Sequence, residues 1–270
     1  MPTAADLLHR FYEQIRLADR DHGPDLTIER DGWVHRAYPP DPADPRAMIE
    51  SPRGLGFDPD AEIARQARFF TDRGQQVEWK TYSYDEPTDL GERLTAAGFV
   101  AASEEALLLG AATRLIEPVP LPSRYAVRAP AGDVEWDQVE ALDEAIFGAG
   151  AGRFARLFRA EEAADPHHVR SVVVVDEASG RIVAQSVLRL VADTDFAGLW
   201  GGKVHPDHRG RGLYRAMTAV RARWALDAGH PICRVDALPT SRPVLERLGL
   251  VQVATTTPYR LTPPQRSATE

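Results

Sequence analysis

The chain of 270 residues contains a single cysteine, Cys233. One cysteine cannot form an intramolecular disulfide and provides no cysteine framework for a zinc site, so redox and zinc-finger functions are excluded. Long apolar segments are also missing, because continuous runs such as residues 107–109 and 172–175 have only strand length. A membrane span needs about 20 apolar residues. The sequence therefore predicts no membrane-embedded segment.

A strongly basic region is missing as well. Residues 1–125 carry 14 Lys and Arg against 22 Asp and Glu, whereas residues 126–270 carry 18 of each, so the first half holds the whole net charge of −8. Because neither half is basic, we expect no nucleic-acid partner. The N-terminus lacks the charged-then-apolar order of a signal peptide, since Asp6, His9 and Arg10 interrupt it. We therefore expect a cytoplasmic protein without a membrane partner.

The composition that remains is that of a globular protein, with 43% hydrophobic and 27% charged residues. The length predicts one or two domains. Residues 117–123 read Glu-Pro-Val-Pro-Leu-Pro-Ser, and alternating prolines favour an extended connector. We therefore predict a domain boundary near residue 122, with one domain over 1–122 and a second over 123–270. The sequence leaves the oligomeric state open.

The first part of the second domain is predicted to contain two helices and a hairpin. After a strand at 125–128, the apolar residues of the first helix recur at helical spacing behind the candidate cap Asp133. A second helix is predicted over 153–164. β-branched strands at 169–175 and 182–191 flank the turn signal Ser179-Gly180, which predicts an antiparallel hairpin.

The remainder of this domain is predicted to alternate strands and helices. A third strand is expected at 199–204 and a long helix at 213–227, which ends before Gly229. A strand at 232–235 should lie parallel to the third strand, because a helix connects the two. A helix near 243–248 is then followed by two more predicted strands, at 250–254 and 259–261.

A weak internal repeat relates the two halves. The segment Arg53-Gly54-Leu55-Gly56 and the segment Arg209-Gly210-Arg211-Gly212 each precede a helical pattern, a glycine and a strand-like run. The spacing from Gly56 to Gly74 is 18 positions, and that from Gly212 to Gly229 is 17. The repeat predicts two copies of one α/β (α+β) fold, each a mixed, mostly antiparallel sheet flanked by helices.

The most specific signal is the glycine-rich turn at 209–214. A turn that leads from a strand into a helix presents backbone N–H groups at the helix N-terminus, where the helix dipole favours an anion. Gly210 and Gly212 would let a pyrophosphate approach, and Arg209 and Arg211 add positive charge. A tight turn without a ligand is the equally simple alternative for an isolated R-G-R-G. Gly201-Gly202 in the preceding strand favours a bulge, beside which a long, thin ligand could lie.

These residues resemble the signature of the GCN5-related N-acetyltransferase (GNAT) family, [QR]-x-x-G-x-[GA]. Arg209 to Leu213 fit it, Val204-His205-Pro206 provides the usual preceding context, and Tyr214 departs from the family's small residue. The resemblance covers residues 123–270 well and residues 1–122 only as a degenerate copy. It implies a tandem GNAT protein whose co-substrate is acetyl-coenzyme A or another acyl-coenzyme A.

The resemblance also implies where the coenzyme binds. Its pyrophosphate would bind the N–H groups of Arg209, Gly210, Arg211, Gly212, Leu213 and Tyr214, and its pantetheine would pair with the backbone of Lys203, Val204 and His205. The bulge would offer an N–H to the thioester oxygen, as an oxyanion hole does. In the first copy Asp58-Pro59-Asp60 follows the glycines, so we expect that copy not to bind coenzyme A.

Acyl transfer to an amine needs a base and a proton donor. Asp236, which follows the strand at 232–235, is the best base candidate, although it could equally be a turn or capping residue. The family's usual acid position is Leu245, so Tyr259 and Tyr214 are the possible donors; packing roles are the simpler alternative for both. The adjacent His167 and His168 have no companion ligand pattern, so no metal is expected.

The sequence favours an acetyl-coenzyme A-dependent N-acetyltransferase that acts on an unidentified small-molecule or peptide amine by direct attack on the thioester. A non-catalytic acyl-coenzyme A sensor or binding protein is the alternative, and Leu245 at the usual acid position favours it. A scaffold without either activity is the third possibility. A fold of this kind accepts many amines, so the acceptor and the acyl chain do not follow from the residues.

Overall fold

The computed structural model describes residues 2–264 apart from 21 and 24, and they form two compact units. The first unit contains residues 2–107, 236–242 and 252–264, and the second contains residues 108–235 and 243–251. These units differ from the predicted domains, because residues 108–122 belong to the second unit and the last strand belongs to the first. No helix in the described part of the chain is long and apolar enough to cross a membrane.

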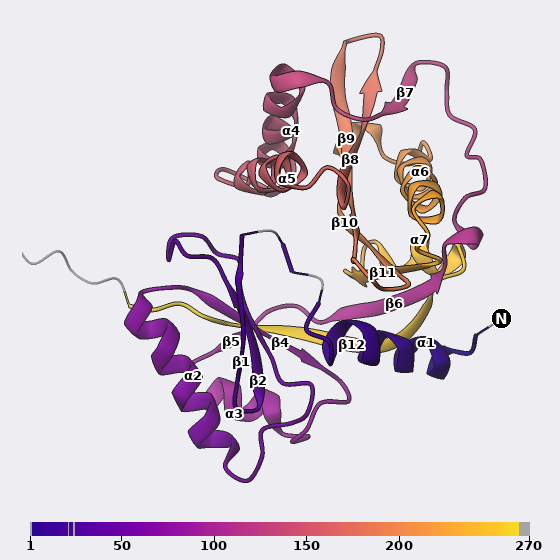
Figure 1. The fold of residues 1–270 in the computed structure, drawn as a ribbon. Helices are drawn as coiled ribbons and strands as arrows, with labels where there is room; N and C mark the ends of the chain where they lie inside the picture. Colours follow the sequence, from indigo (N-terminus) through magenta and orange to yellow (C-terminus); the bar gives the residue numbers. More distant parts are fainter. Residues whose placement is uncertain (1, 21, 24, 265–270) are drawn as a thin grey trace, which may run out of the picture. The chain divides into compact units, whose positions relative to one another are not determined.

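The first unit is a mixed sheet with helices on both faces (Figure 1). Its helices are α1 (Ala4–Phe11), the π-helical η1 (Tyr12–Arg16), α2 (Pro59–Arg73) and α3 (Leu90–Ala96). Its strands are β1 (Thr27–Asp31), β2 (Val34–Tyr38), β3 (Ala47–Glu50), β4 (Val77–Tyr82), β5 (Val100–Ala101) and β12 (Val251–Leu261). The order is β1-β2-β3-β4-β12, with β5 paired to β12. Only β3 and β4 run parallel among these pairs.

The α2 helix connects the two parallel strands of the first unit. Asp58 caps its start by accepting a hydrogen bond from Ala61 N at 3.0 Å, and Gly74 ends it with a φ of 65°. Apolar residues of α2, α3 and the sheet, among them Ile63, Leu94 and Trp79, form the core on one face. On the opposite face the ring of Phe11 in α1 lies 5.8 Å from that of Tyr82, so α1 covers that side of β4.

Between residues 125 and 247, the helices and strands follow the predicted order, with the short η3 added. The helices of the second unit are η2 (Ala112–Arg114), α4 (Gly132–Phe147), α5 (Arg153–Ala164), η3 (Pro206–His208), α6 (Leu213–Asp227) and α7 (Arg242–Arg247). Its strands are β7 (Tyr125–Arg128), β8 (Val169–Asp176), β9 (Arg181–Leu190), β10 (Phe196–Val204) and β11 (Ile232–Ala237). The strand β6 (Glu105–Ala111) begins in the first unit and ends in the second. Conversely, β11 begins in the second unit, and its last two residues, 236 and 237, belong to the first.

The strands of the second unit follow the order β11-β10-β9-β8-β7, and β10 and β11 are its parallel pair. Helices α4 and α5 pack on one face through residues such as Val139 and Phe158, and α6 packs on the other through Leu213 and Met217 (Figure 1). The units thus share one topological element, a parallel strand pair joined by a 15-residue helix, in β3-α2-β4 and in β10-α6-β11.

Three local predictions were wrong. Asp133 does not cap α4, because the helix begins at Gly132 and Asp133 lies inside its first turn. The two strands predicted at 250–254 and 259–261 form one strand, β12, since Pro258 lies in a strand that continues through it. Asp236 lies within β11 rather than after it. For β12, the pairing with β4, a strand far away in the sequence, continues across Pro258.

Candidate functional site

The predicted glycine turn lies at the start of α6. Gly210 and Gly212 have φ values of 74° and 80°, a region that favours glycine. Gly212 is the N-cap of α6, and no side chain among the described residues caps this helix. A Cβ atom on Gly210 would meet nothing within 4 Å. The turn therefore presents an open surface at a helix N-terminus, a place that favours an anion.

Cationic side chains fold back over the same turn. Arg209 Nε donates to the carbonyl oxygen of Val204 at 3.2 Å, and Arg211 Nη1 donates to that of Asp207 at 2.5 Å. His208 Nδ1 lies 3.0 Å from the hydroxyl of Tyr125, and burial together with the charge of Arg211 lowers the pKa of His208. The two exposed guanidinium groups give the turn a positive charge that complements a phosphate.

The proline-rich segment packs against this turn. A Cβ atom on Gly212 would lie 3.2 Å from Val119 Cγ1 and 3.6 Å from Leu121 Cδ2. A glycine is therefore needed at position 212 for two reasons: its φ is positive, and a side chain would crowd Val119. A substitution there would disturb packing as well as ligand binding, so Gly210 is the better residue at which to test the turn.

The predicted bulge of β10 is confirmed. Trp200 pairs with Val187 and Lys203 pairs with Gln185, so the register shifts across Gly201-Gly202. Gly201 has a φ of 59°, and a Cβ on it would lie 2.9 Å from Phe158 Cε2 of α5. A Cβ on Gly202 would lie 2.7 Å from Tyr214 Cε2 of α6. The two glycines therefore let aromatic rings approach the bulge from α5 and from α6.

The strands β10 and β11 separate soon after they begin. They pair only over residues 196–198 and 232–234. Beyond Gly198 this edge of β10 has no other strand beside it among the described residues. On its other side, β10 is hydrogen-bonded to β9, and the segment after it continues this pairing, since His205 N donates to the carbonyl oxygen of Val183 at 2.8 Å. This edge of β10, which no strand of the described residues covers beyond Gly198, is the place at which an extended ligand would pair with the backbone.

Lys203 contributes only its backbone to that edge. Its ammonium forms an ion pair with the carboxylate of Asp143 in α4, and the two side chains are 4% and 1% exposed. Burial lowers the pKa of Lys203 and raises that of Asp143. The sequence reading missed Asp143, although it lies four residues after Val139 and seven after Trp136, on the apolar stripe of α4.

The base candidate Asp236 lies in the first unit. Its Oδ2 accepts a hydrogen bond from Lys80 Nζ at 2.6 Å, and both side chains are buried. Glu105, also in this unit, is influenced by both charges, and burial raises its pKa to about 7. Sequence reasoning missed Glu105; the signal is a carboxylate at the head of the apolar strand β6.

Tyr259 lies on the other face of the same sheet. Tyr259 pairs with Trp79, whose side chain lies in the core on the face covered by α2 and α3. The next residue of β4, Lys80, points to the opposite face, where it binds Asp236. Tyr259 lines a pocket of about 760 Å³ with Thr81, Asp85 and other residues of the first unit. A Cβ on Gly91 would lie 2.2 Å from its hydroxyl. Asp236 and Tyr259 are therefore not brought together.

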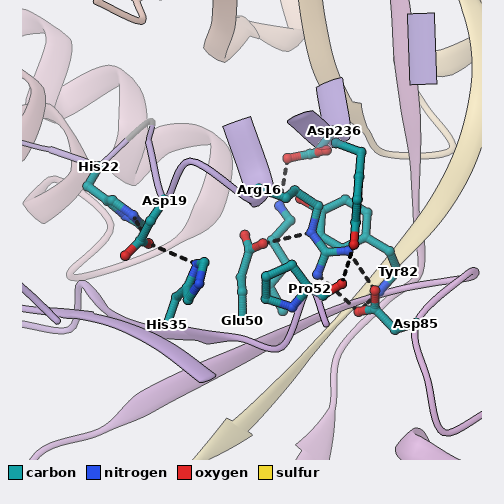
Figure 2. Close-up of polar contacts among 11 residues, drawn as sticks. Arg16, Asp19, His22, His35, Glu50, Pro52, Tyr82, Asp85 and Asp236 are labelled. Carbon is teal, nitrogen blue, oxygen red and sulfur yellow. Dashed lines mark hydrogen bonds and ion pairs between the residues drawn. The ribbon is translucent and has the colours of Figure 1, made fainter. Parts of the chain in front are cut away.

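A buried polar cluster lies beside that pocket in the first unit. Figure 2 shows Arg16 between Glu50 and Asp85: Nε donates to Glu50 at 2.8 Å, and Nη1 and Nη2 donate to Asp85 at 2.6 and 3.2 Å. The guanidinium also lies 4.0 Å from the ring centre of Tyr82. Burial opposes its charge, but the two carboxylates raise the pKa of Arg16 well above its ordinary value.

A second polar group in Figure 2 consists of Asp19, His22 and His35. Asp19 Oδ1 lies 2.9 Å from His22 Nε2 and 3.5 Å from His35 Nδ1. Burial lowers the pKa of His35. Across residues 2–264, outside positions 21 and 24, no group of three or more histidine, cysteine or acidic side chains could hold a metal ion. The pair of imidazoles therefore shares a carboxylate without forming a metal centre.

The glycine segment of the first unit differs from the turn at α6. Gly54 and Gly56 have φ values of 76° and 72°, but a Cβ on Gly56 would lie 2.4 Å from Trp33 Nε1. Leu55 is buried in the core, and the side chain of Asp58 caps α2. The start of α2 thus carries its own carboxylate at the place where α6 leaves room for an anion.

Comparison with known proteins identifies the fold. No protein-family model and no curated protein matches the chain. A GCN5-related N-acetyltransferase from Kribbella flavida is 17% identical, with a TM-score of 0.64 over 98% of this chain and 96% of that one. A tandem GNAT protein from the clavulanic acid biosynthesis pathway is 14% identical, with a TM-score of 0.63 over 98% of both chains. A protein of unknown function from Staphylococcus epidermidis is 13% identical, with a TM-score of 0.69 over 93% of this chain and 99% of that one.

Proposed function

From the fold that this chain shares with the GCN5-related N-acetyltransferases, including a tandem member, we propose that it is an acyl-coenzyme A-dependent N-acyltransferase. The donor is acetyl-coenzyme A, and the acceptor is a small-molecule or peptide amine that attacks the thioester directly. One observation carries the proposal: bulged β10 leaves β11 after three residue pairs and leads into the glycine turn of α6. An open strand edge and an anion site thus follow one another along the chain of a single unit.

The coenzyme is assigned to backbone groups of the second unit. The N–H groups of Arg209, Gly210, Arg211, Gly212, Leu213 and Tyr214 take the pyrophosphate, and the backbone of Lys203, Val204 and His205 takes the pantetheine. The open space at Gly210 and the lack of a side-chain cap on α6 support this fit. The bulge at Gly201-Gly202 would offer an N–H to the thioester oxygen, where negative charge develops during acyl transfer.

The proton transfers are assigned from the chain's own side chains. Asp236 is the proposed base, because it lies two residues after Arg234, the last residue of β11 that pairs with β10. The ion pair with Lys80 keeps its carboxylate in a fixed orientation. Tyr259, the second candidate, lies on the other sheet face of the first unit, so it cannot act on the same atoms as Asp236. Tyr214, whose ring lies against the bulge, is the better proton donor for the departing sulfur.

The first unit is proposed not to bind coenzyme A. Asp58 supplies a carboxylate at the start of α2, and Pro59 lacks an N–H. Arg16, Glu50 and Asp85 fill the edge where the parallel strands β3 and β4 end. In parallel sheets that edge is the usual ligand site. The first unit is therefore a degenerate copy whose ligand edge is occupied by its own side chains.

Calorimetric titration of acetyl-coenzyme A into the purified protein tests the proposal. Binding at one site per chain, followed by coenzyme A release with at least one member of an amine panel, is the expected result. Binding without turnover by any amine would favour the alternative, a non-catalytic acyl-coenzyme A-binding protein; the fully buried, apolar Leu245 at the usual acid position favours that alternative. Two sites per chain would contradict the degenerate first unit, and no binding would contradict both functions.

A further inference from the structure

Arg221 is a buried cation whose hydrogen-bond partners are neutral. It lies in α6 and is 1% exposed. Nη1 donates to the carbonyl oxygens of Val187 at 3.0 Å and of Trp200 at 3.4 Å. Nε donates to the carbonyl oxygen of Met217 at 3.3 Å, and Nη2 donates to Thr218 Oγ1 at 3.4 Å. Among the described residues no carboxylate pairs with this guanidinium, although buried charges in proteins are normally paired.

Two other cations of the same sheet do have carboxylate partners. Lys203 is paired with Asp143 of α4, and Arg189 is paired with Glu161 of α5. Both pairs lie on the face of the sheet that α4 and α5 cover, whereas Arg221 reaches the bulge from α6 on the opposite face. Burial lowers the pKa of Arg221, but its hydrogen bonds to carbonyl oxygens favour the charged form, and arginine keeps its proton in proteins. A positive charge without a counter-charge is therefore placed at the bulge.

The carbonyl of Trp200 belongs to the peptide group that leads into the bulge. The N–H of this group is that of Gly201, and the peptide bond between the two residues is trans. In a planar trans peptide the C=O and the N–H point in opposite directions. Because the carbonyl oxygen is bound to Arg221, the N–H of Gly201 points away from that side chain. Gly201 also has no partner residue in the register of β9 with β10.

A positive charge at the carbonyl oxygen changes the donor strength of the same peptide group. Linked hydrogen bonds polarise one another, and a charged partner in surroundings of low dielectric constant makes the effect larger. The guanidinium draws electron density toward the C=O, so the N–H of Gly201 becomes a stronger donor. A neutral donor would hold the shape of the bulge but would polarise this peptide less. The buried charge of Arg221 thus has a specific effect at Gly201.

We propose that Arg221 polarises the peptide group between Trp200 and Gly201, so that the N–H of Gly201 stabilises negative charge on the thioester oxygen during acyl transfer. This inference rests on the proposed function, which assigns a bulge N–H to that oxygen, and adds the group that strengthens it. Donors of this kind act best when they are fixed before the reaction, and Arg221 holds the carbonyls of Val187 and Trp200. Gly201 is the catalytic residue here, and Arg221 is a positioning residue.

The acyl transfer leaves Arg221 chemically unchanged. The amine nitrogen forms a bond to the acyl carbon, and an electron pair of the carbonyl moves to its oxygen, where the N–H of Gly201 binds it. The carbonyl then re-forms, the carbon–sulfur bond breaks, and the electron pair goes to sulfur. One proton leaves the nitrogen for the base and one proton is taken up by the sulfur, so the products are an amide and the thiol of coenzyme A.

One nuclear magnetic resonance signal reports on this peptide group. Trp200 is the only tryptophan of the sequence that a glycine follows, so full-length protein with ¹³C-carbonyl tryptophan and ¹⁵N-glycine gives a single HNCO peak, that of Gly201. Saturating acetyl-coenzyme A should move the amide proton of this peak downfield, because the N–H then binds the thioester oxygen. In the same complex the infrared stretching band of the ¹³C-labelled thioester carbonyl should lie at a lower frequency than in free acetyl-coenzyme A.

Three substitutions separate the charge of Arg221 from its hydrogen bonds. Arg221→Lys keeps a charged donor, Arg221→Gln keeps a neutral donor, and Arg221→Met keeps neither. Arg221→Lys should retain most of both spectral shifts, whereas Arg221→Gln and Arg221→Met should lose most of them. The control is Arg223→Gln, which removes an exposed cation two residues further along α6 and should leave both shifts unchanged.

Acetyl-coenzyme A binding by calorimetry and thermal unfolding are measured on the same samples. Equal shifts in Arg221→Lys and Arg221→Gln would show that a neutral hydrogen bond suffices, which would overturn the inference and leave the proposed function intact. If these variants do not fold, the wild type decides through the carbonyl coordinate of the same peak, which a cation at the oxygen moves downfield. An ordinary carbonyl shift at Trp200, or bound acetyl-coenzyme A that moves neither the Gly201 proton nor the infrared band, would also overturn the inference alone. No binding of acetyl-coenzyme A to the wild type would overturn both.

Discussion

Lys203 and Asp143 form a buried ion pair one residue beyond the bulge of β10. The pair joins the strand edge to α4, so it fixes the helix that covers this face of the second unit. Gln185, the cross-strand partner of Lys203, is also fully buried, and its side-chain amide has no hydrogen-bond partner among the described residues. The interior beneath α4 and α5 is therefore more polar than a packed core requires.

Removing one member of this pair should destabilise the protein strongly. Asp143→Asn leaves the Lys203 ammonium buried without a counter-charge, and breaking a buried pair in this way costs about 3–5 kcal/mol. Urea unfolding measures the loss. The double variant Asp143→Leu with Lys203→Met removes both charges and should recover most of it. The exposed pair of Arg156 with Glu140 is the control, and Arg156→Gln should change stability by less than about 1 kcal/mol.

If Asp143→Asn and Arg156→Gln cost the same, the ion pair would be irrelevant to the fold. If the double variant were as unstable as Asp143→Asn, packing rather than charge would explain the loss.

The role of the glycine turn can be tested by comparing Gly210 with Gly180, a glycine outside the turn. Gly210→Asp places a carboxylate beside the proposed pyrophosphate site and should weaken acetyl-coenzyme A binding at least tenfold, or about 1.4 kcal/mol. Gly180→Asp is the matched control, because Gly180 has a φ of 67° against 74° at Gly210 and equally free space. Both variants should lose similar stability, and only the first should lose affinity by calorimetry. Equal affinities for the two variants would contradict the assignment of the turn.

Local periodicity predicted the second unit well. The spacing in α4 and α6, the β-branched runs of β8 and β9, and the glycines of the bulge are all short-range signals, and each element lies where it was expected. The parallel pairing of β10 and β11 followed from the helix between them. These features depend on residues that are close in sequence, so the sequence alone specifies them.

Other features depend on residues far apart in the chain. The antiparallel pairing of β12 with β4 joins Tyr259 to Trp79, and no local pattern indicates such a partner. Arg16 is a cation in a helical segment, which predicts an exposed residue, yet it is buried between Glu50 and Asp85. Arg221 is likewise buried in a helix whose spacing alone cannot distinguish it from the exposed Arg223.

The Arg16 cluster should be essential for the stability of the first unit. Arg16→Met leaves the carboxylates of Glu50 and Asp85 facing each other without a cation, and about 3–5 kcal/mol should be lost near neutral pH. Burial already raises the pKa of Asp85, so its carboxylate protonates readily once Arg16 is gone. The loss should therefore shrink as the pH is lowered. Arg93→Met, in a more exposed cluster with Asp60 and Asp89, is the control and should cost much less stability, because solvent screens exposed ion pairs.

Urea unfolding of the two variants at several pH values measures this difference. A loss for Arg16→Met that does not change with pH would show that the contact of Arg16 with Tyr82, rather than its charge, carries the stability.

Glu105 should make the stability of the protein fall as the pH rises. Burial raises its pKa from the ordinary 4.5 to about 7, with the nearby negative charge of Asp236 acting in the same direction and Lys80 opposing both. Between these two values the folded state binds more protons than the unfolded state, so the free energy of unfolding decreases with pH. The contribution of Glu105 is fully present below about pH 4.5 and is lost as the pH passes about 7.

Glu105→Gln keeps a neutral side chain at every pH, so it should flatten the pH dependence over this window. The measurement is the urea midpoint of both proteins across the window, with Glu104→Gln, the exposed neighbouring carboxylate, as the control that keeps the wild-type slope. A wild-type slope that Glu105→Gln leaves unchanged would assign the titration to another group. A wild-type stability that rises through the window would show that the ammonium of Lys80 outweighs burial and holds Glu105 ionised.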